Sequence, residues 1–191
     1  MKRSSRWLSC ALGTLLALQV GAARAEEAKP RELEGVGVTE HKGQPIALDA
    51  TFRDHAGRPV RLGDIAGRGR PTLLTLNYFT CPMLCSLQLR GLINGLRGVE
   101  WTPGEDYDLV TVSFDPDETQ ANAARARDGY LKELRRLGAE WHFLTGTPDQ
   151  IHKLLESVGM HIKKDEKGQW AHPAVAVLLA PDGRITQYLY G

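Results

Sequence analysis

The chain has 191 residues, of which 42% are hydrophobic, and its 24 lysine and arginine residues nearly balance its 23 aspartate and glutamate residues. This length suits one domain with a substantial core. After residue 25 no block or stripe of basic residues remains, which argues against binding to nucleic acid or to an anionic membrane surface.

Residues 1–25 have the pattern of a secretory signal peptide. Basic residues at positions 2, 3 and 6 precede an apolar stretch over 7–20, and Ala23-Arg24-Ala25 supplies the small residues that signal peptidase requires. The apolar stretch is too short for a comfortable membrane span. We therefore expect an exported, periplasmic or extracytoplasmic protein, with membrane contact only if the signal is retained as an anchor.

Removal of residues 1–25 would change both the charge and the cysteine content. It takes away four basic residues and no acidic ones, leaving 20 basic and 23 acidic residues, a net charge of −3. It also takes away Cys10 and leaves Cys81 and Cys85. A disulfide between residues this close would constrain the unfolded chain only weakly. The pair therefore indicates reactivity or metal binding.

Residues 26–43 are interpreted as an extended lead-in, and 44–191 as the single folded domain. Within it, 51–62 predicts a short hairpin that turns at Ala56-Gly57. The near-continuous apolar run over 72–79 is typical of a central strand covered on both faces. A helix over 85–96 follows.

A second apolar strand is predicted over 108–114, and a helix over 118–137. Leu137 would lie on the inward face of that helix, and Gly138 would be its C-cap. A short third strand is expected over 141–144.

The next helix begins at Thr147-Pro148, with proline at the first helical position. Its predicted apolar face consists of Ile151, Leu154, Leu155 and Val158. Residues 168–171 are interpreted as a loop. A closing hairpin over 175–179 and 184–190 turns at Pro181-Asp182-Gly183.

This order of elements predicts an α/β, thioredoxin-like fold: a central mixed sheet flanked by helices, with an N-terminal hairpin. Strands that alternate with helices form a parallel sheet, whereas the last two strands must be antiparallel. A thioredoxin fold normally ends with a helix over one sheet face, but the sequence stops at Tyr190-Gly191, so this final helix is apparently missing: either this end is unusually short or residues are missing. We therefore expect exposed apolar surface there.

Cys81 and Cys85 follow the first central strand, at a strand-to-helix turn. If Cys85 lies in the first helical turn, i,i+4 geometry brings both sulfurs close enough to share a soft metal or form a disulfide. A helix N-terminus also favours the thiolate. Pro82 stiffens the turn, and Met83 is interpreted as a packing residue more readily than as a third soft ligand.

His172 stands immediately before the penultimate strand, in a loop that faces the cysteine turn in a thioredoxin-like topology. Two thiolates and one imidazole form a soft ligand set that suits copper, whereas Zn²⁺ usually takes a fourth ligand. None of the other five histidines has a comparable position. The alternative is that His172 only packs within its loop.

Asp115 ends the second central strand at the same edge of the sheet. There its carboxylate would support the ligands or tune thiol protonation. An equally good interpretation is a turn or helix-capping aspartate.

At these residues the chain resembles the Sco/SenC family of copper-handling thioredoxin-fold proteins, associated with the assembly of cytochrome c oxidase. The resemblance covers roughly residues 44–191. It rests on Phe79-Thr80-Cys81-Pro82-Met83-Leu84-Cys85, on Val112-Ser113-Phe114-Asp115-Pro116, and on His172 before Leu178-Leu179-Ala180-Pro181-Asp182-Gly183.

The resemblance implies that Cys81, Cys85 and His172 bind Cu(I) or Cu(II) and that the two cysteines interconvert between dithiol and disulfide. It also implies a cuproprotein client, such as a cytochrome c oxidase subunit. The chain departs from the family pattern at Ser86, where proline is common, and in the segment after Asp115-Pro116, which is one residue short. Pro173 occupies a position that resembles the cis-proline of thioredoxin-like reductases, which favours a redox role.

The leading hypothesis is an extracytoplasmic copper metallochaperone. The alternative is a thiol-disulfide oxidoreductase that reduces the cysteines of a partner's metal site and is itself served by a thiol-reducing partner. Against it, thioredoxin-type enzymes separate their thiols by two residues, and here there are three. A peroxiredoxin-like peroxidase lacks a clearly placed arginine, and two merely structural cysteines are disfavoured by the proline-containing turn.

Overall fold

The computed structural model of the protein describes residues 33–81 and 84–191, with the backbone alone at positions 84 and 85. The predicted signal peptide and the first part of the lead-in lie outside the described residues. In the described part, none of the helices has the length and apolar character needed to cross a bilayer.

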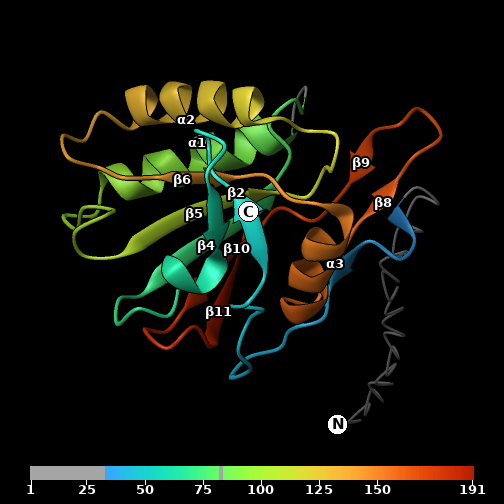
Figure 1. Ribbon diagram of the computed structural model, residues 1–191, viewed down its shortest axis with the longest axis horizontal. Coiled ribbons are helices and arrows are strands. Elements are labelled where there is room, and N and C mark those ends of the chain that lie inside the picture. The colour runs from blue at the N-terminus through green and yellow to red at the C-terminus, as the bar shows by residue number, and fades with distance from the viewer. Residues whose placement is uncertain (1–32, 82–83) are drawn as a thin grey trace, which may run out of the picture.

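The chain alternates strands and helices as expected (Figure 1). In chain order the elements are β1 (Gly37–Val38), β2 (Thr51–Arg53), β3 (Pro59–Arg61), the 3-10 helix Leu62–Asp64, β4 (Thr72–Asn77), α1 (Leu84–Arg97), β5 (Asp108–Ser113), α2 (Gln120–Leu134), β6 (His142–Leu144), α3 (Pro148–Ser157), β7 (Met160–His161), β8 (Lys163–Lys164), β9 (Trp170–Ala171), β10 (Val175–Leu179) and β11 (Ile185–Tyr190).

The central sheet has five strands in the order β11-β10-β4-β5-β6. β4, β5 and β6 are parallel, while β10 runs antiparallel to both β4 and β11. The predicted hairpin also forms, with β2 antiparallel to β3. These pairings confirm the predicted α/β fold and mixed sheet.

Helices cover both faces of this sheet: α1 and α2 lie along one face, and α3 lies on the other (Figure 1). Side chains alternate between the two cores. Leu73 and Leu109 pack with α1 and α2, whereas Leu74 and Val110 pack with α3. Because both faces are covered, all six residues of β4 and all six of β5 are buried.

The α3 helix confirms its predicted apolar face, since Ile151, Leu154, Leu155 and Val158 are all buried. The described part of the lead-in packs on the same side of the domain, where β1 pairs with β7. Gly159 permits this close approach, because a Cβ built there would lie 1.9 Å from the Thr39 carbonyl oxygen, and its φ is +64°.

The predicted end of the second long helix was wrong. α2 ends at Leu134, and Arg135 caps it in the left-handed conformation with φ 55°. Leu137 is fully exposed rather than inward, and Gly138 lies beyond the cap. The Arg136 guanidinium donates to the carbonyl oxygen of Leu96 at 3.1 Å, a tertiary contact with α1 that helical periodicity does not reveal.

Part of the predicted loop over 168–171 is strand β9, which forms a small antiparallel pair with β8. The Lys164 ammonium lies 5.0 Å from the centre of the Trp170 ring, a cation-π contact across this pair. Two-residue strands are too short to give a periodic signal in the sequence.

The expected exposed apolar surface is present between α1 and the β10–β11 edge. Leu87 is 60% exposed, and Leu189 and Tyr190 are exposed beside it. With Leu92 and Ala176 they line a hollow of about 450 Å³.

Candidate metal centre

The turn after β4 carries Cys81. Its N–H donates to the Tyr78 carbonyl oxygen at 3.3 Å, and its half-buried side chain packs against the core cluster that contains Tyr78 and Phe114. The backbone of Cys85 lies in the first turn of α1, as predicted. Pro82, Met83 and the side chain of Cys85 lie outside the described residues, so the pairing of the two sulfurs stays a prediction.

His172 lies between β9 and β10, and only 5% of its surface is exposed. The centre of its ring is 5.0 Å from that of Phe114 and 6.1 Å from that of Tyr78, the residue whose carbonyl accepts the Cys81 N–H. Because β10 inserts beside β4, the loop before it returns to the carboxyl end of that strand. The structure therefore brings His172 beside the turn that holds Cys81.

The hydrogen bonding of the His172 ring suits a metal ligand. Its Nδ1 lies 3.1 Å from the Pro173 carbonyl oxygen, which can only accept, so Nδ1 carries the proton in this contact. The lone pair is then on Nε2, and a backbone carbonyl that fixes the tautomer is a common partner of metal-binding histidines. Burial lowers the pKa of His172, although the hydrogen bond to Pro173 acts in the opposite direction. The ring is thus kept neutral at pH 7, the form that binds metals.

Pro173 does not have the geometry expected from its resemblance to the reductase proline. The described residues contain no cis peptide bond, so the bond between His172 and Pro173 is trans. Pro173 therefore shares the position of the reductase proline but not its cis geometry, and the redox alternative stays a prediction.

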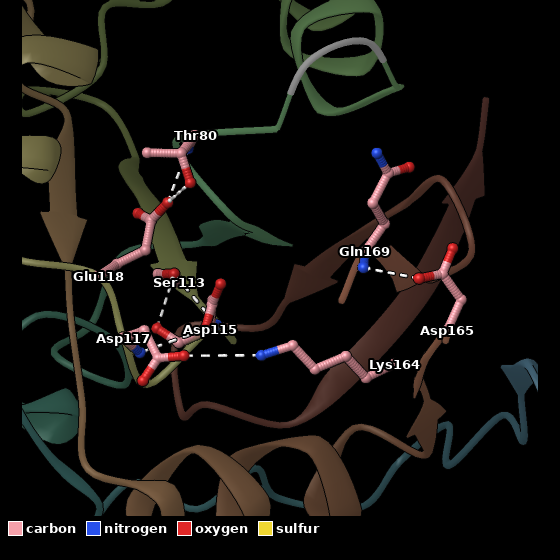
Figure 2. A network of polar contacts seen from close by, with 8 residues as sticks. All are labelled: Thr80, Ser113, Asp115, Asp117, Glu118, Lys164, Asp165 and Gln169. Carbon is pink, nitrogen blue, oxygen red and sulfur yellow. Dashed lines mark hydrogen bonds and ion pairs between the residues drawn. The ribbon is translucent and has the colours of Figure 1, made fainter. Parts of the chain in front are cut away.

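Asp115 follows β5 and forms a turn (Figure 2). Its carboxylate accepts the N–H of Asp117 at 3.1 Å, and its own N–H donates to the Ser113 hydroxyl at 3.2 Å. These contacts favour the turn interpretation. A supporting role toward the thiols stays a prediction.

Glu118 is a residue near the site that sequence reasoning missed. It is only 9% exposed, and its Oε1 accepts both the N–H of Thr80 at 2.6 Å and the Thr80 hydroxyl at 2.7 Å (Figure 2). Thr80 immediately precedes Cys81. The sequence feature that could have indicated Glu118 is the cluster Asp115, Asp117 and Glu118, which follows the second central strand at the predicted site.

Among the side chains that the structure describes, no group of three histidine, cysteine, aspartate or glutamate residues could hold a metal ion. The predicted set needs Cys85, whose side chain is not among them. The two members that are described, Cys81 and neutral His172, supply a soft sulfur and an imidazole nitrogen. This pair fits a soft metal such as copper.

Residues 38–191 match the sequence model of the SCO1/SenC family. The chain belongs to this family. It is 32% identical over 177 residues to the mitochondrial SCO2 homolog of Bos taurus, an alignment that covers 87% of this chain and 62% of that protein. The chain thus spans less than two thirds of this curated relative.

Solved structures share the fold. A protein from Aquifex aeolicus VF5 is 27% identical with a TM-score of 0.70, covering 78% of this chain and 85% of that one. Arabidopsis thaliana ScoI, solved with copper bound, is 21% identical with a TM-score of 0.61, covering 78% and 87%. BsSco, a member of the Sco family of cytochrome c oxidase assembly proteins with a disulfide switch, is 20% identical with a TM-score of 0.58, covering 80% and 86%. They confirm the predicted thioredoxin-like fold of this Sco-family protein.

Proposed function

We propose that this protein binds one copper ion through Cys81, Cys85 and His172 and delivers it to a cuproprotein, such as a subunit of cytochrome c oxidase. The observation that carries the proposal is the buried, neutral His172 ring beside the Cys81 turn. Membership of a family with a copper-bound structure and a link to oxidase assembly supports it.

The three proposed ligands would suit transfer as well as binding. Copper(I) tolerates low coordination by soft ligands, and a three-ligand set leaves room for a ligand from the client. Copper is then the cargo, and it would leave as client ligands replace Cys81, Cys85 and His172 in turn. No turnover of a substrate is required.

Anaerobic titration of the reduced protein with Cu(I), against a competing chelator, tests this function. We expect one tight site in the wild type, weakened by at least about tenfold in Cys81→Ala, Cys85→Ala and His172→Ala. His152→Ala, on the exposed surface of α3, is the matched control and should bind like the wild type. A wild-type protein without a tight site would exclude copper delivery.

We further propose that the two thiols are redox-active. Cys85 lies at the N-terminus of the 14-residue helix α1, where the helix dipole favours a thiolate. Oxidation to the disulfide would remove both sulfur ligands, so a thiol-reducing partner would be needed before copper could be loaded. Exchange with a model disulfide that is fast without metal and unchanged in His172→Ala would instead favour the reductase alternative.

Export is part of the proposal, because an oxidase client would be met outside the cytoplasm. Residues 1–25 would direct the chain across the membrane, and the intact mass of the purified protein tests their removal. A mature protein that begins at Glu26 is expected. A chain that keeps these residues and fractionates with membranes would indicate an anchor instead.

A further inference from the structure

The segment between β5 and α2 contacts both halves of the proposed site. Its first residue, Phe114, donates its N–H to the Asn77 carbonyl oxygen at 2.9 Å, so the chain leaves β5 beside the chain that leaves β4. The Phe114 ring then packs against His172 and against Tyr78, with centres 5.0 Å and 5.6 Å away. One end of this segment therefore supports the histidine.

The other end of the segment holds the thiol-bearing turn. A single oxygen of the Glu118 carboxylate accepts two short hydrogen bonds, one from the backbone and one from the side chain of Thr80 (Figure 2). Hydrogen bonds to an ionised acceptor are stronger than neutral ones. The hydrogen bond from the Cys81 N–H to the Tyr78 carbonyl oxygen, within the same turn, is long at 3.3 Å. Glu118 is thus a strong constraint on the residue next to Cys81.

Burial of this carboxylate needs an explanation. The second oxygen, Oε2, is buried and has no hydrogen-bond partner in the described part of the chain. A buried carboxylate oxygen without a hydrogen-bond partner lowers the stability of the fold. The two hydrogen bonds from Thr80 to the other oxygen offset this loss. A solvated position for Glu118 on the surface would avoid that cost.

Within the described residues, the two neighbouring acidic residues make other contacts. The carboxylate of Asp115 accepts from Asp117 within the turn, and exposed Asp117 pairs with Lys164 at 3.5 Å (Figure 2). Of the three acidic residues after β5, Glu118 is the one that reaches the turn before Cys81.

We propose that Glu118 is a positioning residue for the copper ligand Cys81. It acts through Thr80 and holds the thiol-bearing turn to the same segment that packs on His172, so that the sulfur and the imidazole keep a fixed spacing. This proposal rests on the proposed function for its purpose. Whether Glu118 holds the turn can be measured in the metal-free protein.

The first experiment uses the reduced, metal-free protein and compares Glu118→Ala and Glu118→Gln with Asp117→Ala, the matched control from the same loop. In the Glu118→Ala protein we expect hydrogen exchange of the Thr80 amide and alkylation of Cys81 by iodoacetamide to accelerate about tenfold or more. Glu118→Gln, which keeps the shape but loses the charge, should give a smaller increase. Asp117→Ala should leave both rates unchanged.

The second experiment titrates the same variants with copper. We expect the Glu118 variants to bind copper about 10- to 100-fold more weakly, with a changed electron paramagnetic resonance spectrum of the Cu(II) form, and Asp117→Ala to behave like the wild type. Thr80→Val should reproduce part of the effect, because it removes one of the two donors.

The outcomes separate the two proposals. Equal Thr80 exchange and Cys81 alkylation in Glu118→Ala and Asp117→Ala would overturn the positioning role, even with copper bound normally by the wild type. A wild-type protein that binds no copper would overturn the proposed function, while the metal-free rates would still decide whether Glu118 holds the turn.

Discussion

The residues around His172 determine the protonation state and the tautomer of its ring. Packing against Phe114 and Tyr78 removes it from water, and the Pro173 carbonyl selects the tautomer. The order of elements in the sequence was enough to place this residue near the turn that holds Cys81. The aromatic neighbours could not be predicted, because they come from the ends of two separate strands.

Phe114 is the side chain that joins these neighbours, since its ring also lies 6.0 Å from that of Trp170. It is almost completely buried. We expect Phe114→Ala to lower the free energy of unfolding by about 3–5 kcal/mol, from lost burial and the cavity that remains. Urea denaturation measures this, and Leu137→Ala, at a fully exposed leucine, should change stability by less than about 0.5 kcal/mol. Similar values for both would contradict the packing described.

The half-buried His142 predicts how the stability of the protein depends on pH. Burial lowers the pKa of His142, despite the opposing effect of the nearby Glu140 and Asp108 carboxylates. In the unfolded chain this histidine regains its ordinary pKa of about 6.5, so below that pH the unfolded state binds more protons. The stabilisation is therefore complete above pH 6.5 and is lost as the pH falls toward the folded-state pKa.

Urea unfolding of the metal-free protein at pH 7.5, 6.5 and 5.5 checks this prediction. We expect His142→Gln to reduce the loss of stability between pH 6.5 and 5.5, by at most about 1.4 kcal/mol per pH unit. Leu137→Gln, at a fully exposed position without a titratable group, serves as the control and should keep the wild-type slope. A steeper slope in His142→Gln would show that the sign is wrong.

At the scale of elements, the long buried strands and the amphipathic helix α3 were predictable, because burial on one or both faces leaves a clear periodic pattern. The ends of α2 and the β8–β9 pair were not. The end of α2 coincides with contacts from Arg136 to distant carbonyls, and β8 and β9 are two-residue strands whose lysine–tryptophan contact joins separate segments. Glu118 was missed for the same reason, since its partner Thr80 is distant in sequence.

The C-cap of α2 gives a prediction about that element. Arg135 adopts a left-handed conformation in which its Cβ is unfavourable and glycine is preferred. We expect Arg135→Gly to raise the free energy of unfolding by about 0.5–1 kcal/mol, and Lys132→Gly, inside the same helix, to lower it by about 1 kcal/mol. Thermal unfolding of the two variants compares them. A loss of stability in both would indicate that the arginine side chain matters more than the backbone conformation.

At the scale of the whole molecule, the hollow between α1 and the β10–β11 edge is the clearest exposed apolar surface described. We expect the native protein to bind an apolar fluorescent dye there and Leu87→Glu to reduce that binding, because it places a charge in the lining. Leu137→Glu changes an exposed leucine away from the hollow and should leave the dye signal unchanged. An equal loss of dye binding in both variants would show that the dye binds elsewhere.

The position of β10 between β4 and β11 also sets an order of events in the life of the chain. Cys81 and Cys85 are synthesised well before His172, and β10 must pair with β4 before the imidazole reaches the turn that holds Cys81. A nascent or truncated chain therefore carries both cysteines before the His172 ring lies beside the Cys81 turn. If the proposed function holds, full copper binding requires that the chain has been made through β10 and that this strand has paired with β4.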